Sequence, residues 1–148
     1  MKLPSRVATA LALTLATFMA AGARAQSEPA FRVIVHPEVA GARLARQKLS
    51  DIFLRKALQW VDGVAIEPVD QSTTSPVRAS FSKQVHGQSV AAVQAYWFRQ
   101  ISAGRSRPPS VKASDGEVMR YVAGTPGSIG YVSADAALPP TVKVLEIE

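Results

Sequence analysis

The chain has 148 residues, of which 17 are Lys or Arg and 11 are Asp or Glu, and it contains no cysteine. Without cysteine it forms no disulfide and carries no lipid on a cysteine, so a packed core must supply its stability. Without the first 25 residues, which include Lys2, Arg6 and Arg24, the net charge falls from +6 to about +3, with 14 basic residues against 11 acidic ones. That excess is too small to predict a nucleic-acid-binding face.

The first 25 residues have the pattern of a secretory signal peptide. Lys2 and Arg6 precede a mostly apolar run at 7–21, and Ala23-Arg24-Ala25 provides the small residues that a signal peptidase requires. The run is about 15 residues long, short of the roughly 20 that span a bilayer. We therefore expect cleavage after Ala25, no membrane anchor, and a single domain at 26–148 that works in the periplasm or outside the cell.

Residues 31–35 predict the first strand and residues 43–54 the first helix. The run FRVIV is rich in β-branched side chains, and Pro37 favours extended backbone just before it. In the helix, four apolar residues fall on one face at helical spacing, namely Ala45, Leu49, Ile52 and Phe53.

A second strand is expected at 64–69, after the turn signal Asp62-Gly63. The helix that follows the strand is short. Ser75 is its expected N-cap, Pro76 its first residue and Gly87 its end.

Two longer helices are expected in the second half of the chain. Ser89 caps the first, which Gly104 closes, and its apolar stripe consists of Val90, Val93, Trp97 and Ile101. Ser114 and Glu117 form the capping box of the second, whose predicted buried face is Val118, Tyr121 and Val122.

Two further strands are expected at 128–132 and 141–147, which gives four strands alternating with four or five helices. This order is typical of an α/β layer sandwich with a largely buried sheet. The prediction is one α/β domain with a mixed sheet of about four to five strands flanked by helices.

The common metal-binding and catalytic patterns are missing from the sequence. His36 and His86 do not form an HExxH or paired-histidine motif, so we expect no metal and no cofactor. The nucleophile elbow GxSxG is also absent, and the glycine period at 124–130 suits a helix end and a turn rather than a dinucleotide site. We interpret both histidines as structural, one at a strand end and one at an exposed helix end, and we expect no enzyme activity.

The stretch DQSTTSPVRASF at 70–81 is the one place where local residues favour a ligand. A helix N-terminus offers unpaired amides and a partial positive charge, and hydroxyl side chains gather at the same point. Arg78 in the first turn opposes the helix dipole unless an anion is bound. The alternative is that Arg78 is exposed or paired with Asp70 and that the serines only cap the helix. The candidate anion-binding residues are Ser72, Thr73, Thr74, Ser75 and Arg78.

Five motifs occur in an order that resembles a known family. They are VIVHP, LSDIFLRKALQW, VAIEPVDQSTTSPVRASF, YWFRQISAGRSRPP and VMRYVAGTPGSIGYV. Together they resemble the phosphate-binding proteins of ABC phosphate importers, most closely their short single-lobe relatives, over residues 31–133. The resemblance implies a single lobe of a type II periplasmic-binding-protein fold, entered through the strand at 31–35. The first lobe, which supplies part of the ligand shell in the family, has no counterpart in this sequence.

The loop departs from that family, in which it reads approximately R-S-D-G-S-G-T-T. Gln71 stands at the arginine, Thr73 at the aspartate and Arg78 at the last threonine, and only Ser72 and Ser75 match. The two losses remove a bidentate cation and the acceptor that distinguishes phosphate from sulfate. Pro76 removes one amide donor as well.

The leading hypothesis is an exported solute-binding-type protein with a reduced site for inorganic phosphate or a similar oxyanion, working with an ABC permease or another envelope protein. Half a ligand shell implies weak binding or a second surface that completes the shell. The alternative is a ligand-free interaction or sensing module that retains the lobe. A hydrolase that uses Ser72 or Ser75 is a third class.

Overall fold

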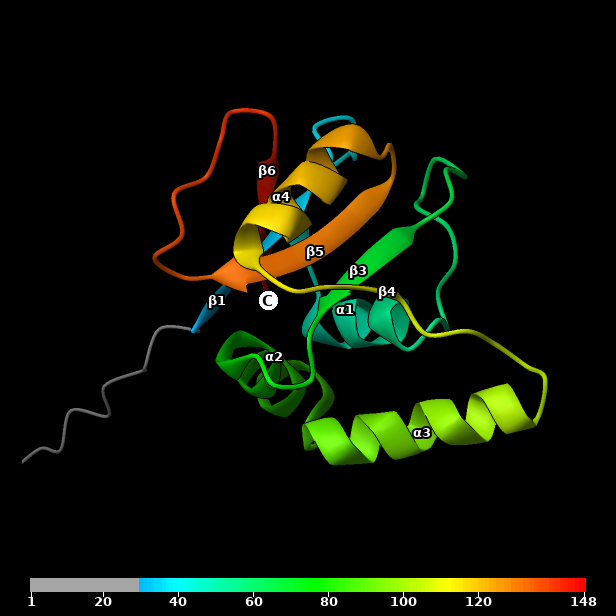
Figure 1. Ribbon diagram of the computed structural model, residues 1–148. Coiled ribbons are helices and arrows are strands. Elements are labelled where there is room, and N and C mark those ends of the chain that lie inside the picture. Colours follow the sequence, from blue (N-terminus) through cyan, green and yellow to red (C-terminus); the bar gives the residue numbers. More distant parts are fainter. Residues whose placement is uncertain (1–29) are drawn as a thin grey trace, which may run out of the picture.

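The computed structural model describes residues 30–148, whose arrangement is shown in Figure 1. The predicted signal peptide at 1–25 and its cleavage after Ala25 lie outside the described residues. Within the described part of the chain, no helix is both long and apolar enough to cross a membrane.

The strands of residues 30–148 form one mixed sheet of six strands. In chain order they are β1 Phe31–Val35, β2 Arg43–Leu44, β3 Glu67–Gln71, β4 Ser110–Lys112, β5 Ser128–Ser133 and β6 Lys143–Ile147. Their order across the sheet is β2-β6-β1-β5-β3-β4. β1 runs antiparallel to β5 and β6, whereas β3 runs parallel to β5 and β4, and β2 runs parallel to β6. The predicted α/β class and mixed sheet are confirmed.

β1 is a central strand, as its β-branched sequence predicts. Phe31 pairs with Ser133 on one side, and Val33 pairs with Leu145 on the other. The side chains of Val33, Ile34 and Val35 are almost completely buried. A continuous apolar run suits a strand that is covered on both faces.

Sequence reasoning missed the two edge strands, β2 and β4. Residues 43–44 were assigned to the first helix and residues 110–112 to a loop, but each forms a short parallel ladder with its neighbour. Two or three residues are too few to show the alternation that identifies a strand. These strands are therefore specified by the main chain of their partners, β6 and β3.

Four α-helices and one π-helix occur between residues 30 and 148. They are α1 Arg46–Phe53, α2 Pro76–Phe81, the π-helix η1 Ser82–His86, α3 Val90–Ser102 and α4 Asp115–Gly124. The predicted N-caps Ser75, Ser89 and Ser114 are confirmed, because each side chain accepts a hydrogen bond from the amide three residues later. The short helix ends at Gly87, as predicted, although its second half is a π-helix.

The helices cover both faces of the sheet. α4 packs through Val118 and Val122 against Ile34, Val69 and Val132 on one face. α1 and α2 cover the other face, where Phe81 stacks on Tyr131 with ring centroids 3.9 Å apart. This aromatic contact fixes α2 against β5, immediately beside the loop that the sequence singled out.

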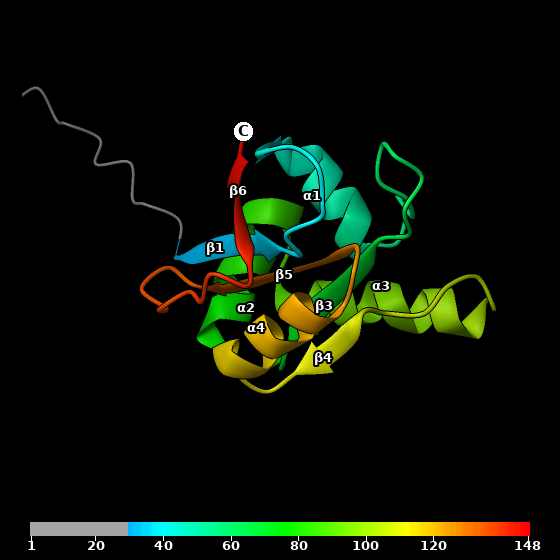
Figure 2. The same cartoon turned by 90° about the horizontal axis from the view of Figure 1, so that it is seen from above.

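α3 lies at the periphery and extends away from the sheet in Figures 1 and 2. Val93 and Trp97 pack against Leu54, in agreement with the predicted stripe. Ile101 was expected in the same stripe, but 56% of its surface is exposed. The prediction for Ile101 was wrong because the last turn of α3 runs beyond the body that covers its first turns.

Gly127 is required by the turn that leads into β5. Its φ angle is +76°, and a Cβ atom at this position would overlap the carbonyl oxygen of Ala65. The turn therefore requires glycine at position 127, within the glycine period at 124–130. Only glycine adopts this backbone without strain and leaves room for the neighbouring chain.

We expect Gly127→Ala to lower the free energy of unfolding by roughly 2–4 kcal/mol, because positive-φ strain and overpacking add at one position. Gly124→Ala is the matched control, since a Cβ there would meet nothing within 4 Å. Urea denaturation of both variants measures the difference. Equal stabilities of the two variants would contradict the assignment.

Candidate anion-binding loop between β3 and α2

The loop between β3 and α2 brings the predicted hydroxyl residues into one turn. The amide of Ser75 donates to the carbonyl oxygen of Ser72 at 2.9 Å, and the side-chain oxygens of Ser72 and Thr74 are 3.1 Å apart. Thr73 and Thr74 are exposed. The loop therefore presents neutral hydrogen-bonding groups to solvent at the end of β3.

The hydroxyl of Ser75 is already used inside the protein. Its Oγ accepts a hydrogen bond from the amide of Arg78 at 3.4 Å and donates one to Oε1 of Gln71 at 2.8 Å. α2 has only six residues, and Pro76 at its start lacks one of the amides that an anion would use. The helix end thus contributes little to a site.

Arg78 does not face the solvent. Only 5% of its surface is exposed, and its Nη1 lies 3.0 Å from Oδ2 of Asp70 and 2.7 Å from the carbonyl oxygen of Gln71. The sequence left open whether Arg78 binds an anion, is exposed or pairs with Asp70. The structure shows the pair with Asp70. The carboxylate of Asp70 therefore offsets the positive charge that the loop was expected to offer.

Asp70 is the centre of a buried hydrogen-bond network. In addition to its contact with Arg78, it accepts hydrogen bonds from the hydroxyl of Tyr131 and from the amide of Gln71, the latter at 2.9 Å. Burial raises the pKa of Asp70, while Arg78, Tyr131 and Gln71 act in the opposite direction. Burial and the neighbouring Asp70 also raise the pKa of Tyr131. The network connects β3, β5 and α2.

Gln71 connects the same loop to the start of α4. Its Nε2 donates to Oδ1 of Asp115 at 2.8 Å and to the carbonyl oxygen of Tyr131 at 3.0 Å. The other carboxylate oxygen of Asp115 accepts a hydrogen bond from the amide of Ser133 at 3.2 Å. Both amide hydrogens of Gln71 are therefore used. Gln71 therefore links the end of β3 to α4 and β5, and its amide hydrogens are not free for a ligand.

Sequence reasoning offered the pair of Arg78 with Asp70 as an alternative, but it did not identify Gln71, Tyr131 and Asp115 as members of the network. Asp70 and Gln71 stand directly before the hydroxyl run, which is a usable local signal. Tyr131 lies in a strand motif, and Asp115 lies in a helix capping box. Neither pattern indicates a contact with the end of β3, because that contact depends on the order of the strands in the sheet.

His86 is not at an exposed helix end, contrary to the prediction. Its ring lies against Phe81, and its Nδ1 is 2.8 Å from the hydroxyl oxygen of Ser50. Burial, assisted by Arg78 and Lys56, lowers the pKa of His86 to about 4. The imidazole is therefore neutral at pH 7 and belongs to the packing between α1 and η1. His36 stands just after β1, where its ring accepts a hydrogen bond from the amide of Glu38.

Neither a metal centre nor a serine–histidine pair is present at the loop. Among residues 30–148, no three His, Asp or Glu side chains gather closely enough to hold a metal ion. The hydroxyls of Ser72 and Ser75 bond to Thr74 and Gln71, and the histidine-bonded serine is Ser50. Ser50 is buried within α1.

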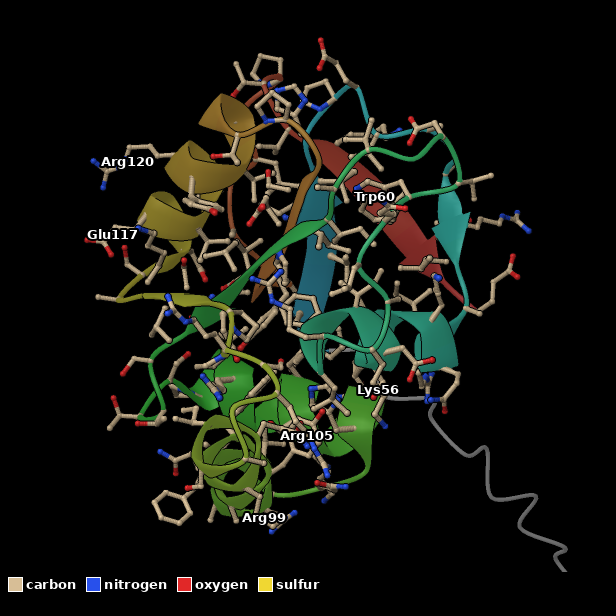
Figure 3. The ribbon with its side chains drawn as sticks, turned by 90° about the vertical axis from the view of Figure 1, so that its right-hand side faces the viewer. Lys56, Trp60, Arg99, Arg105, Glu117 and Arg120 are labelled. Carbon is tan, nitrogen blue, oxygen red and sulfur yellow. The ribbon has the colours of Figure 1, made fainter. Side chains whose placement is uncertain are left out.

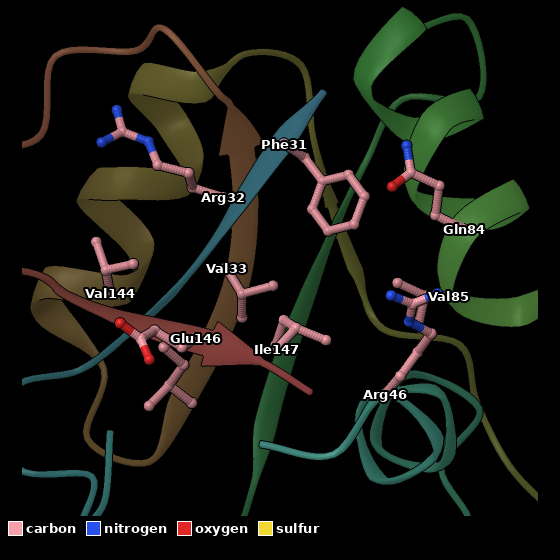
Figure 4. A pocket seen from close by; sticks show the side chains of 10 residues that line it. Phe31, Arg32, Val33, Arg46, Gln84, Val85, Val144, Glu146 and Ile147 are labelled. Carbon is pink, nitrogen blue, oxygen red and sulfur yellow. The ribbon is translucent and has the colours of Figure 1, made fainter. Parts of the chain in front are cut away.

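A cavity of about 500 Å³ lies away from the loop, between the β1–β6 part of the sheet and the helices α1 and η1 (Figure 4). Phe31, Val33 and Val85 form part of its wall, and Arg46 and Gln84 lie at its edge. None of the predicted anion-binding residues lines it. The loop and this cavity are separate features of the molecule.

Comparisons with known proteins place the fold. No family model matches the sequence, and no curated protein matches it either. A proposed phosphate ABC transporter substrate-binding protein from Clostridium perfringens, solved with bound phosphate, has a TM-score of 0.63 and 17% identity, over 80% of this chain and 44% of that one. An ABC-type phosphate transport receptor from Vibrio cholerae has a TM-score of 0.63 and 16% identity over 80% and 46% of the two chains. PstS from Borrelia burgdorferi has a TM-score of 0.62 and 19% identity over 80% and 47%.

The fold is that of a single lobe of these proteins. This confirms at the level of the fold the resemblance that the sequence motifs predict. The chain spans less than half the length of each of the three proteins. Identities below 20% establish the architecture but do not carry over the residues that bind a ligand.

We expect Arg78→Met to destabilise the protein by roughly 3–5 kcal/mol, because it leaves the carboxylate of Asp70 buried without its cation. Arg43→Met is the matched control, since Arg43 pairs with Glu146 at an exposed position, where such pairs contribute at most about 1 kcal/mol. Urea denaturation followed by circular dichroism measures both. A loss below about 1 kcal/mol for Arg78→Met would show that the pair does not hold α2 to β3.

The lowered pKa of His86 predicts a loss of stability in acid. The native protein disfavours protonation of this ring, whereas the unfolded chain takes up a proton below pH 6.5. The contribution of neutral His86 to the free energy of unfolding should therefore be fully present above pH 6.5. It should fall as the pH decreases towards about 4 and level off below that pH. The fall should amount to roughly 2–3 kcal/mol. Unfolding curves of His86→Gln should lose this dependence while those of His36→Gln keep it; an unchanged profile for His86→Gln would refute the assignment.

Proposed function

We propose that the protein is a non-enzymatic binding module of the cell envelope, which uses one lobe of the phosphate-binding fold to dock to another protein and does not carry phosphate by itself. The buried pair of Asp70 and Arg78 is the observation that supports this proposal. Asp70 neutralises Arg78, the one cation at the loop between β3 and α2, at the position where a ligand would bind. Export to the periplasm, which the leader predicts, is part of the proposal.

An oxyanion would have to compete with Asp70 for Arg78. Breaking the pair leaves a buried carboxylate without its partner, which costs several kcal/mol. Without Arg78, the remaining donors are the hydroxyls of Ser72, Thr73 and Thr74 and a few amides. A hydrated anion loses its water favourably only when strong donors surround it, and half a shell of neutral groups does not meet this condition.

A reduced oxyanion site is the second candidate function. It is supported by the fold, which is shared with a protein solved with bound phosphate, and by the exposed hydroxyls of Thr73 and Thr74. In this case a permease or another envelope protein supplies the second half of the ligand shell. The ligand would be inorganic phosphate or a similar oxyanion.

Isothermal titration of the folded protein with phosphate and with sulfate at low salt separates the two candidates. Docking without a ligand predicts no heat of binding with either anion up to about 1 mM. A Kd of about 1 mM corresponds to a binding free energy of only about 4 kcal/mol. A micromolar Kd for phosphate would contradict it. If that binding also weakens at least tenfold in Ser72→Ala/Thr74→Val, the loop is the site.

A further inference from the structure

Two segments on the side of the molecule that faces the viewer in Figure 3 carry the net charge of the described chain. We define the basic face as residues 55–64 and 98–107. It contains five basic residues and one acidic residue, whereas the rest of residues 30–148 contains nine of each. Lys56, Arg99 and Arg105 project from this side in Figure 3.

The same face exposes apolar side chains. Seven large apolar residues are exposed within residues 30–148, and five belong to the basic face: Leu58, Val61, Val64, Phe98 and Ile101. Single exposed apolar residues are common, but their concentration beside unbalanced charge indicates an interaction surface.

Val61 stands at the tip of a firmly held loop. Its side chain is fully exposed, and the following Asp62 closes the turn by accepting a hydrogen bond from the amide of Val64. The preceding Trp60 anchors the loop, because its indole Nε1 donates to the carbonyl oxygen of Gly127 at 2.9 Å. The fold therefore holds an apolar side chain out into solvent.

The end of α3 forms a second projection. Ile101 lines a hollow of about 400 Å³ together with Arg105 and Arg107, which follow the turn at Gly104. In Figures 1 and 2 this end of α3 and the loop around Val61 reach out on the same side of the molecule. The end of α3 thus combines an exposed apolar residue with cations, and the loop at Val61 adds a second exposed apolar residue on the same side.

The cations of the basic face are not paired within the described chain. Lys56, Arg99, Arg105 and Arg107 make no ion pair with any described residue, in contrast to Arg43, which contacts both Glu146 and Glu148. All four are exposed. Their charge is therefore available to an external anionic surface.

We propose that the basic face adsorbs to an anionic phospholipid surface, with Val61 and Ile101 entering the headgroup region and the arginines contacting lipid phosphates. Apolar tips beside cations are the combination that binds membrane interfaces, and arginine binds phosphate oxygens through two hydrogen bonds. A lipid surface can contact two separate tips at once, whereas a protein–protein interface has one contiguous apolar core. The proposal does not depend on the loop at Ser72–Ser75 or on the docking function.

Co-sedimentation of the purified protein with vesicles tests the proposal. The protein should bind vesicles of equal parts phosphatidylglycerol and phosphatidylcholine at about 50 mM salt, and it should not bind pure phosphatidylcholine. Raising the salt to about 300 mM should release most of it, because screening shortens the range of the charges. Absence of binding to the anionic vesicles at low salt overturns the proposal and leaves the face to an acidic protein partner.

Charge variants locate the contact. Arg105→Gln/Arg107→Gln should weaken vesicle binding about 25-fold, at about fivefold for each charge removed near the surface. Lys48→Gln/Lys83→Gln removes the same charge outside the basic face and should change binding less than about threefold. Val61→Asp should also weaken binding, and circular dichroism verifies that each variant is folded. Equal losses in the two charge variants would mean that only net charge is sensed, which contradicts a defined face.

Discussion

The ion pair between Asp70 and Arg78 is the interaction on which the rest of this region depends. Asp70 lies near the end of β3, and Arg78 lies in the first turn of α2, so the pair fixes the helix against the strand. Tyr131 completes the network from β5, and its ring also stacks on Phe81. A polar network and an aromatic stack thus hold the same helix from two sides. Such a network is costly to leave incomplete, and here Asp70, Gln71 and Arg78 all have partners.

Under the proposed function, the network explains how this fold keeps its shape without a bound ligand. A site built for an oxyanion concentrates cations and donors, and these groups are unfavourable when they are buried without a partner. In this chain Asp70 supplies the negative charge and Gln71 connects the donors to Asp115. The buried polar groups of this region thereby have their partners inside the protein.

Features with a local cause could be predicted from the sequence, and features with a tertiary cause could not. The strand at 31–35 and the caps at Ser75 and Ser114 follow from residues within a few positions of each other. The edge strand at 110–112 depends on the main chain of β3, and the partly buried position of His86 depends on packing against another helix, where Ser50 is its partner. The sequence is compatible with the pairing of Asp70 with Arg78, but also with an exposed or anion-binding Arg78. Only the depth of burial at the end of β3 decides between them.

The central place of β1 bears on when the chain can fold. This first strand lies between β5 and β6, so its two ladders join the beginning of the described chain to its end. Closing loops of this length has a large entropic cost before any contact compensates for it. Folding is therefore expected to wait until nearly the whole chain is available, and to be slower than in folds with mainly local contacts. Under the proposed export, such a chain would reach the membrane before it folds.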